Sequence, residues 1–408
     1  MSALALGHVG NVEPGIIHSC VASGGTVRII AADGTCRPNE TALDWNAQGV
    51  LPEPASVLVD CAAGDTVGQA LADTAFAPSV QITVLGSCTE SVGIQRDDVA
   101  LIAAPEGGTL LAPSPDDGIL HLKGTRIVVD GLTLSGGAQG LIGQPGASFD
   151  ARELHITGTG TAVQLSGAAG SLHQLVIDSC EEGISAGDGA SVSVGGGSIS
   201  NCVLGVGAQN GSGVSLFGVA IADTTRMGIS SDFGGSVAML DGTTISNAGH
   251  IGAFAFGGSI FLKGTGTEIT GSTFDGLHAG EGGLVSLNDG ARVAGNHGGV
   301  SASNGGAVLI QEGVIVEDNT GVGVHLEGVS SLSMQNGVIV RNNTDHGIFL
   351  SGTSVAEFGD GTNEIVDNGG WGILCAGPPS VSLLQGEHPG TVTGNFAGDI
   401  GCPSDFDF

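Results

Sequence analysis

From Val99 onward, the apolar residues recur in short alternating runs, such as Val-Ser-Val at 192–194 and Val-His-Leu at 324–326. These runs show the period of two that is typical of β-strands, and no window shows the 3.6-residue period of an amphipathic helix. One feature repeats along the chain: an Ile or Val is followed three positions later by a small or amide residue. The residues at this position are Cys180, Cys202, Thr224, Ala248, Ser272, Asn296, Asn319, Asn343, Asn368 and Asn395.

The repeat has a step of 22 to 27 residues, which fits one coil of three short strands and the turns between them. Strands of adjacent coils lie about 4.8 Å apart, so equivalent residues stack into columns. The sequence therefore predicts an all-β fold, a right-handed parallel β-helix of roughly a dozen coils. In such a fold, stacked amides can pass hydrogen bonds along the axis. We expect this ladder at Asn296, Asn319, Asn343, Asn368 and Asn395.

Eight cysteines fall into four local pairs, which are Cys20 with Cys36, Cys61 with Cys88, Cys180 with Cys202, and Cys375 with Cys402. The third and fourth pairs each share one column of the predicted coils, and the coil spacing suits a disulfide. Because these columns were assigned from hydrophobic spacing alone, the two cysteine pairs support the alignment of the coils. Buried free thiols are the alternative.

The segment before the repeat has a different organisation. Residues 1–50 are expected to form a small β-hairpin module, with strands at 16–21 and 26–31 and a disulfide between Cys20 and Cys36. Residues 51–56, with Pro52 and Pro54, are expected to be a linker. Residues 57–98 would form the first coil and its cap, with a short helix that begins after Asp65 or Thr66. Residues 99–408 would be the β-helix and a C-terminal tail.

Charge and composition narrow the class of partner. The 41 acidic against 10 basic residues give a formal charge of −31, which repels phosphate backbones, so nucleic acid is not an expected partner. No stretch of 18 apolar residues is present, so we expect no membrane span.

Eight cysteines favour an oxidising compartment. Because residues 1–10 lack the basic start of a signal peptide, we expect an exported chain from which that signal has been removed.

Two parts of the chain resemble known proteins. The segment from Ile16 to Gly49 resembles a small module common in exported bacterial proteins, which implies a location rather than an activity. Residues 57–402 resemble the right-handed parallel β-helix proteins that include pectate lyases, polygalacturonases and alginate epimerases. The phrases IVEDN, IVRNNTDHGIFL and IVDNGGWGIL, at 315–319, 339–350 and 365–374, carry this resemblance. This resemblance implies the fold but gives little information on a catalytic activity.

One tripeptide, Asn343-Thr344-Asp345, resembles a carboxylate motif of polygalacturonases. The other motifs of that family are missing, apart from a near match at Asn296-His297-Gly298. Since Asn343 is also the ladder residue of its coil, we favour a structural role for it.

If the protein is an enzyme, the basic and acidic residues of the first coils are the candidates for catalysis, because a polysaccharide lyase needs a base and cations beside the substrate carboxylate. These candidates are Lys123, Arg126, Asp130, Asp150, Arg152 and His155. The alternative is that they form surface ion pairs. Glu268 with Arg292 and Glu317 with Arg341 are expected to form such pairs between neighbouring coils.

One outward row could bind a partner, because it stacks apolar and imidazole side chains on successive coils. Its members are Phe254, His278, His325, Phe349 and Leu374. Two alternatives remain: another part of the protein covers the row, or a slip of one residue turns it inward.

No spacing of His or Cys indicates a transition metal, and no cofactor is expected, although the acidity leaves Ca²⁺ possible. His250 and His297 lie too far apart to share an ion.

Three functions remain compatible with the sequence. The first is a non-catalytic scaffold, secreted or on the cell surface, that serves in binding, adhesion or assembly. The alternative is a carbohydrate-active enzyme, namely a lyase, hydrolase or epimerase, that acts on an extracellular acidic polysaccharide. The third is a self-assembling fibre subunit. The expected partners are accordingly an extracellular polysaccharide, a protein surface or another copy of the chain. The absence of Tyr argues against a strong sugar-binding surface.

Overall fold

The computed structural model describes residues 16–22, 26–31, 34–46, 55–359, 361–376, 383–386 and 389–402. The chain divides into two compact units, a small N-terminal unit and a β-helix that begins at Ser56. Each unit is described separately below. Among the described residues, no helix reaches the length and hydrophobicity that a membrane span requires.

The N-terminal unit is a three-stranded antiparallel sheet of order β2-β1-β3. Its strands are β1 (Ile16–Ala22), β2 (Val27–Ile30) and β3 (Glu40–Asn46). The expected hairpin of β1 and β2 is confirmed, and β3, which the sequence analysis did not predict, pairs along the whole of β1. A lone hairpin is marginal in water, and a third strand gives β1 partners on both edges. The Cys20–Cys36 disulfide and the Arg28–Glu40 ion pair of 2.6 Å fasten the strands together.

The first coil begins with β4 (Ala55–Asp60), a 3₁₀ turn (Cys61–Ala63), α1 (Val67–Asp73) and β5 (Val80–Thr89). The expected helix is confirmed, and Thr66 caps it by accepting a hydrogen bond from the backbone of Gln69. Glu90 also accepts hydrogen bonds from two backbone amides of the first turn, a contact that the sequence did not indicate. The strand β4 begins at Ala55, inside the expected linker, whose residues 51–54 lie outside the described part.

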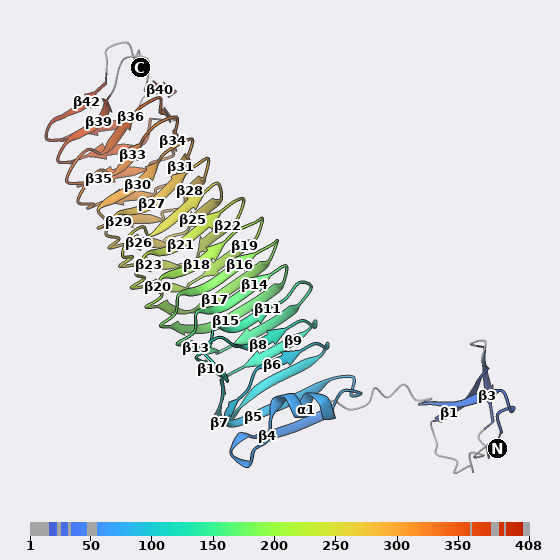
Figure 1. Ribbon diagram of the computed structural model, residues 1–408. Helices are drawn as coiled ribbons and strands as arrows, with labels where there is room; N and C mark the ends of the chain where they lie inside the picture. The colour runs from blue at the N-terminus through green and yellow to red at the C-terminus, as the bar shows by residue number, and fades with distance from the viewer. Residues whose placement is uncertain are drawn as a thin grey trace. The chain divides into compact units, whose positions relative to one another are not determined.

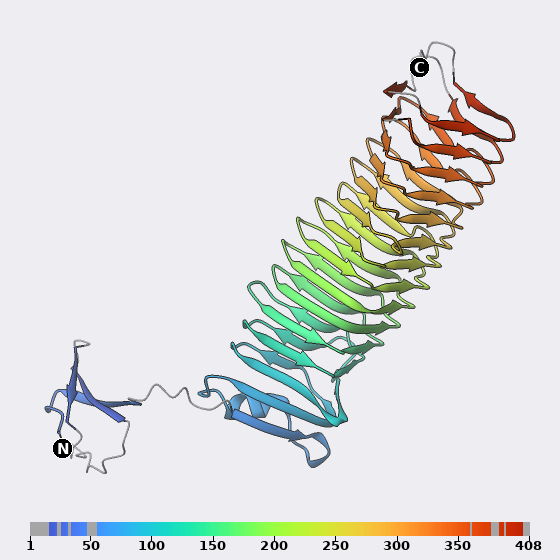
Figure 2. The same ribbon diagram turned by 180° about the vertical axis from the view of Figure 1, so that it is seen from behind.

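The β-helix consists of two parallel sheets that run along its whole length (Figures 1 and 2). The 14-stranded sheet contains β6 (Val92–Ile94), β8 (Gly118–Leu122), β11 (Gln139–Gly143), β14 (Thr161–Ser166), β16 (Glu182–Gly187), β18 (Leu204–Ala208), β21 (Met227–Asp232), β24 (Ala253–Phe256), β27 (Asp275–Gly280), β30 (Gly298–Ala302), β33 (Val324–Leu326), β36 (Ile348–Ser351), β39 (Trp371–Ala376) and β42 (Gly398–Gly401).

The 25-stranded sheet contains β4, β5, β7 (Val99–Leu111), β9 (Ile127–Asp130), β10 (Thr133–Ser135), β12 (Ser148–Arg152), β13 (His155–Thr157), β15 (Ala169–Asp178), β17 (Ser191–Ser200), β19 (Gly213–Phe217), β20 (Ala220–Ala222), β22 (Ser236–Leu240), β23 (Thr244–Ser246), β25 (Ser259–Lys263), β26 (Glu268–Thr270), β28 (Leu284–Asn288), β29 (Arg292–Ala294), β31 (Ala307–Gln311), β32 (Ile315–Glu317), β34 (Ser331–Gln335), β35 (Ile339–Arg341), β37 (Val355–Phe358), β38 (Glu364–Val366), β40 (Leu383–Gly386) and β41 (Thr391–Thr393).

The predicted parallel β-helix is thus confirmed, but it is longer than the expected dozen coils, because the 14-stranded sheet receives one strand from each coil. The number of coils was underestimated because the first coils are less regular in length. For example, Arg126 bonds to Asp98, which lies 28 residues earlier, outside the predicted range of 22 to 27. The strands alternate as expected, and their inward side chains stack into columns that exclude water. One such column is Ile177, Ile199, Ile221, Ile245 and Ile269, each at most 1% exposed.

Each coil of the repeat turns sharply just before its ladder residue. The residue at this turn is left-handed throughout, with φ between 52° and 69° at Ser179, Asn201, Asp223, Asn247 and Gly271, for example. Asn, Asp and Gly tolerate this conformation best. The turn directs the next side chain, which is the ladder residue, into the interior.

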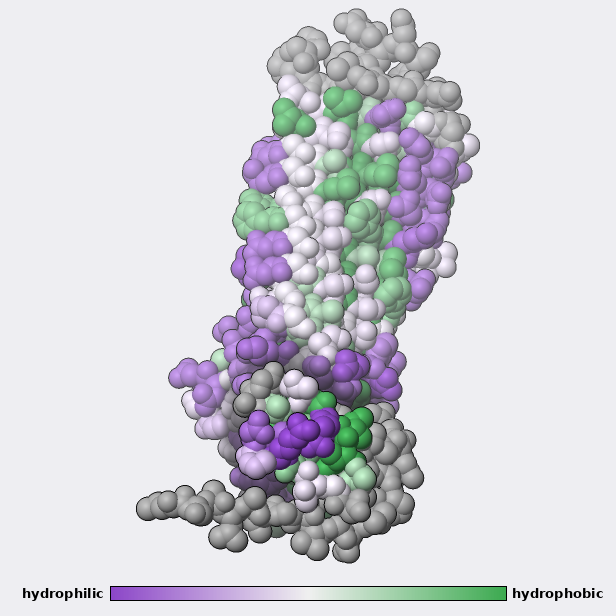
Figure 3. All heavy atoms as spheres, turned by 90° about the vertical axis from the view of Figure 1, so that its right-hand side faces the viewer, coloured by the Kyte–Doolittle hydropathy of each residue, from purple (hydrophilic) through white to green (hydrophobic). Residues whose placement is uncertain are grey.

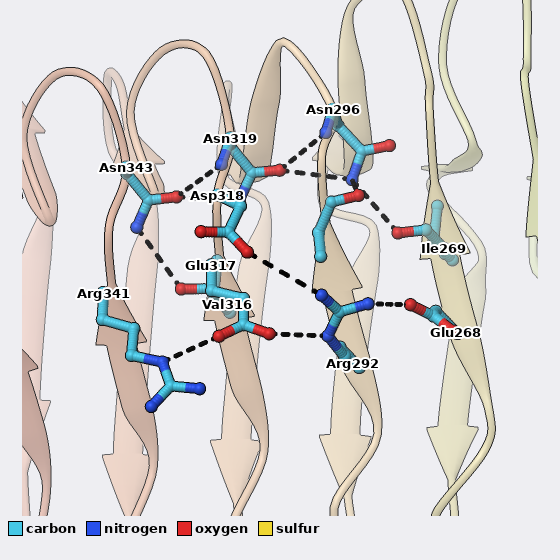
Figure 4. Close-up of polar contacts among 11 residues, drawn as sticks. Glu268, Ile269, Arg292, Asn296, Val316, Glu317, Asp318, Asn319, Arg341 and Asn343 are labelled. Atoms are coloured by element: carbon cyan, nitrogen blue, oxygen red, sulfur yellow. Dashed lines mark hydrogen bonds and ion pairs between the residues drawn. The ribbon is translucent and has the colours of Figure 1, made fainter.

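The Asn ladder is confirmed (Figure 4). The Oδ1 atom of Asn343 accepts hydrogen bonds from the backbone N–H and the side chain of Asn319, at 3.2 and 2.8 Å. The Oδ1 atom of Asn368 does the same for Asn343, at 3.1 and 2.9 Å. Asn296 and Asn395 extend this series at its two ends. All five side chains are buried, so the ladder satisfies polar groups that would otherwise lack partners.

All four expected disulfides are present: Cys20–Cys36, Cys61–Cys88, Cys180–Cys202 and Cys375–Cys402. The last two join neighbouring coils, with Cα–Cα distances of 4.5 and 4.7 Å. The expected ion pairs between coils are also confirmed, and Arg292 joins them into one network. Its guanidinium group contacts both Glu268 and Glu317, and Glu317 also binds Arg341 at 2.7 Å (Figure 4).

Candidate functional site

The outward row that the sequence singled out lies in register on the 14-stranded sheet. Phe254 pairs with His278, and the column continues through Ser301 to His325. Phe349 and Leu374 follow on the next two strands. The residues on either side of positions 254, 278, 325 and 349 are buried, so the row faces outward and the alignment has not slipped. Ser301 is buried, whereas the five residues of the predicted surface are partly exposed.

The rings of this row contact one another along the axis. The centroids of Phe254 and His278 lie 5.2 Å apart, and those of His325 and Phe349 are stacked at 5.1 Å. His346 approaches Phe349 at 5.5 Å. Burial lowers the pKa of His325, against the opposing effect of the nearby Asp275 carboxylate. His325 is therefore neutral at physiological pH, which suits a ring that stacks on Phe349.

A second row of rings, which the sequence analysis missed, runs beside the first at the turns before the strands. Phe274 lies between His250, at 5.2 Å, and His297, at 6.2 Å. A phenyl ring therefore separates the two imidazoles that were judged too far apart to share an ion. The signal for this row was present in the sequence, since the three rings recur at the coil period.

A groove of about 470 Å³ opens here and is lined by residues from both rows. Its lining consists of Phe274, Asp275, His297, Gly298, Gly299, Val300, Thr320, Gly321, Val322, His325, Thr344 and Asp345. The lining thus combines two carboxylates, two imidazoles and a phenyl ring, and it contains no Lys or Arg. Rings beside a few polar groups are typical of ligand sites.

The two carboxylates of the groove have imidazole partners. His278 Nδ1 lies 3.2 Å from an oxygen of Asp275, and His346 Nε2 lies 3.4 Å from an oxygen of Asp345. The Nδ1 atom of His346 accepts a hydrogen bond of 2.9 Å from the backbone N–H of Trp371. That bond requires an unprotonated Nδ1, so the Nε2–H group of His346 is the one directed at Asp345.

The polygalacturonase-like tripeptide is divided between two roles. Asn343 is buried in the ladder, as expected, whereas Thr344 and Asp345 line the groove. The near match at Asn296-His297-Gly298 is divided in the same way: Asn296 is in the ladder, and His297 and Gly298 line the groove. The structural role that we favoured for Asn343 is confirmed, and Asn296 has the same role, while the residues that follow both asparagines line the groove.

The candidates of the first coils lie apart from this groove, on earlier coils, and three of them, Asp130, Asp150 and Arg152, lie together. Arg126 binds Asp98 through two bonds of 2.6 Å, which lower the pKa of that carboxyl group. Arg152 binds Asp150 at 3.0 Å and lies in register with Asp130. Both guanidinium groups are thus engaged with carboxylates of this chain, as the ion-pair alternative expected.

Two further candidates from the first coils, Lys123 and His155, are exposed, and His155 lies on another strand, β13. The structure therefore does not gather the six candidates into one site.

Potential metal ligands gather in one place among the described residues, at Cys20, Cys36 and Glu40 of the N-terminal unit. The two sulfur atoms are bonded to each other in a disulfide, so they do not fit a metal ion.

A separate apolar band runs lengthwise on another side of the β-helix (Figure 3). The outward apolar residues of the 25-stranded sheet include Phe217, Phe261 and Leu284, each 37% exposed. A pocket of about 370 Å³ that includes Phe217 on this surface lacks the carboxylate–imidazole pairs of the groove.

The fold and the groove together define a parallel β-helix protein with a ring-lined, carboxylate-bearing groove. No known protein family matches the sequence, and no curated protein matches it either. Among solved structures, the chain is similar to the A-module of the mannuronan C-5 epimerase AlgE6 from Azotobacter vinelandii. The identity is 12%, the match covers 83% of this chain and 95% of that one, and the TM-score is 0.40.

The chain is also similar to the catalytic domain of a GH87 α-1,3-glucanase in complex with nigerose. Here the identity is again 12%, the match covers 93% of this chain and 88% of that one, and the TM-score is 0.38. At this identity, the two likenesses concern the fold alone.

Proposed function

We propose that the protein is an extracellular glycan-binding β-helix whose groove holds a neutral polysaccharide. The observation that carries this proposal is the lining of the groove. The phenyl ring of Phe274 is 46% exposed and offers apolar surface to a sugar, and the carboxylates of Asp275 and Asp345 accept hydrogen bonds from sugar hydroxyls. The four disulfides support an oxidising, extracellular location.

The charge of the groove selects the kind of glycan. A polyuronate needs cations beside its carboxylates, but the groove lining contains two acidic residues and no Lys or Arg. The whole chain also carries a formal charge of −31. Because like charges repel, a neutral glycan fits this groove better than the acidic polysaccharide that the sequence suggested.

The spacing of the two carboxylates argues against glycoside hydrolysis by this pair. Asp275 begins β27, and Asp345 precedes β36, which lies three strands further along the 14-stranded sheet. Three coil spacings amount to roughly 14 Å, whereas paired catalytic carboxylates of glycosidases lie about 5 to 9.5 Å apart. We therefore assign Asp275 and Asp345 to glycan binding.

Calorimetric titration with a panel of soluble neutral glucans, mannans and galactans tests this proposal, with polyuronates measured in parallel. We expect at least one neutral glycan to bind and the polyuronates to bind more weakly. Phe274→Ala and Asp345→Asn should each weaken binding by about tenfold, which corresponds to about 1.4 kcal/mol.

Phe261→Ala is the matched control, because Phe261 is a half-exposed phenylalanine on the other sheet. It should leave the affinity unchanged. Failure of every neutral glycan to bind, or equal effects of the Phe274 and Phe261 variants, would refute the proposal.

A further inference from the structure

A hydrogen-bonded cluster of two serines, a histidine and an aspartate lies at the edge of the groove. His278 is at its centre, with its Nδ1 atom 3.2 Å from Asp275 Oδ2 and 2.7 Å from Ser301 Oγ. On the opposite side of the ring, Nε2 lies 3.0 Å from Ser303 Oγ. The side chains of Asp275 and His278 are 14% and 19% exposed, and Ser303 is also partly exposed.

The contacts fix which nitrogen of His278 carries the proton. The hydroxyl of Ser301 has two acceptors, the carboxylate of Asp275 and the carbonyl of Leu277; when it donates to either of them, its oxygen accepts from Nδ1. The ionised carboxylate of Asp275 can also only accept. Both neighbours therefore require a proton on Nδ1. In the neutral ring Nε2 is then an acceptor, and the hydroxyl of Ser303 donates to it.

We propose that Ser303, His278 and Asp275 form a nucleophile–base–acid triad that hydrolyses esters. The order of contacts is the one that acyl transfer requires: a serine hydroxyl at one imidazole nitrogen and a carboxylate at the other. The three residues come from two neighbouring coils, since Asp275 and His278 belong to β27 and Ser303 follows β30. Ser301 positions Asp275 against the ring.

The reaction balances without a cofactor. The Oγ atom of Ser303 forms a bond to the ester carbonyl carbon, and its proton passes to Nε2 of His278. The bond from that carbon to the alcohol oxygen then breaks, and the alcohol leaves with the proton. Water adds to the acyl-serine and gives a proton to Nε2, after which the acid leaves and Ser303 recovers its proton.

Backbone donors for the developing oxyanion lie directly after the nucleophile. Asn304 and Gly305 are exposed and have φ values of 49° and 83°, in a turn closed by the bond from Gly306 N to Ser303 O. In the described part of the chain, the backbone N–H groups of Asn304 and Gly305 donate no hydrogen bond. They are therefore free to stabilise negative charge on a substrate oxygen, as the amide after a nucleophilic serine commonly does.

The position of the triad indicates the class of ester. Asp275 belongs both to the triad and to the groove lining, so an acyl group on a hydroxyl of a bound sugar would lie close to Ser303. This assignment of an O-acylated neutral glycan as the substrate rests on the proposed glycan binding. The triad itself does not, and a small ester can test it alone.

Hydrolysis of p-nitrophenyl acetate by the full chain is the first test. We expect Ser303→Ala and His278→Gln to lower kcat/KM by about 100-fold or more relative to the unaltered protein. Ser193→Ala is the matched control, because Ser193 is a half-exposed serine on the other sheet, and it should retain full activity. Circular dichroism shows whether each variant keeps its fold.

A fluorophosphonate probe with peptide mass spectrometry tests the nucleophile in the unaltered protein, so this result does not depend on the folding of any variant. We expect covalent labelling at Ser303, and we expect Ser301→Ala to keep that label. Labelling at Ser301, no labelling of any serine, or hydrolysis equal to that of the Ser303 variant would overturn the proposal. Ser303→Ala should still bind the neutral glycan, so a failure of the triad and a failure of glycan binding are distinguishable.

Discussion

At the residue scale, the interior of the β-helix depends on side chains that satisfy one another from coil to coil. Asn343 illustrates this, because its amide serves four groups. Its Oδ1 accepts from the backbone and side chain of Asn319, and its Nδ2 donates to Asn368 and to the carbonyl of Val316. Asn343 is only 1% exposed, so water cannot replace these bonds.

Replacing Asn343 by Ala should therefore destabilise the β-helix. The change leaves two buried donors of Asn319 without an acceptor, and we expect the free energy of unfolding to fall by about 2–4 kcal/mol. Urea denaturation followed by the fluorescence of Trp371 measures this change. Asn342→Gly is the control, because Asn342 is exposed and has a φ of 54° that glycine adopts freely. A loss no larger than in the control would contradict the ladder's role.

At the scale of elements, side chains on adjacent strands hold the register of the 25-stranded sheet. Glu317 on β32 is the centre of this contact, since it binds Arg292 on β29 and Arg341 on β35. Its side chain is 10% exposed. Burial raises the pKa of Glu317, but the hydrogen bonds from the two arginines outweigh this and leave the pKa below its usual value. The network is therefore more than a pair of exposed surface charges.

This lowered pKa predicts a dependence of stability on pH. A carboxyl group whose pKa is lower in the folded state stabilises the protein above its unfolded pKa, and this contribution is lost as pH falls through the folded pKa. We expect Glu317→Gln to destabilise the protein at pH 7 and the difference from the unaltered protein to shrink progressively below about pH 4.5. Thermal unfolding at a series of pH values measures this. The exposed Glu357, changed to Gln, should show no such pH-dependent difference.

At the scale of the whole molecule, the chain carries a formal charge of −31, and its isoelectric point is about 4.2. Few cations offset this charge, since the chain has only ten Lys and Arg in total. Self-repulsion therefore opposes the folded state at neutral pH, and the disulfides and the buried columns must outweigh it.

Salt should consequently stabilise the folded protein. We expect the melting temperature at pH 7 to rise by about 2–5 °C between 10 and 500 mM NaCl, because dissolved ions screen the repulsion. The same titration near pH 4.2 is an internal control, since the net charge is then close to zero and salt should have little effect. Differential scanning calorimetry measures both. An equal response at the two pH values would show that repulsion does not limit stability.

The sequence by itself determined the features that recur once in every coil. A period near 24 residues places residues of successive coils in one column, so the Asn ladder, the outward row and the Cys180–Cys202 and Cys375–Cys402 disulfides followed from spacing alone. The physical reason is that a parallel stack converts sequence distance along the chain into a fixed distance of one strand spacing. The sequence predicted too few coils, because the first coils depart from that period.

Contacts between different columns were decided only by the tertiary structure. The pairing of His278 with Ser303, and the position of His297 and Asp345 in one groove, depend on side-chain directions and on the shape of each turn. A period contains no information on either, since it relates equivalent positions and not neighbouring ones. The sequence therefore supplied the outward row, and the fold supplied the groove beside it and the triad at its edge.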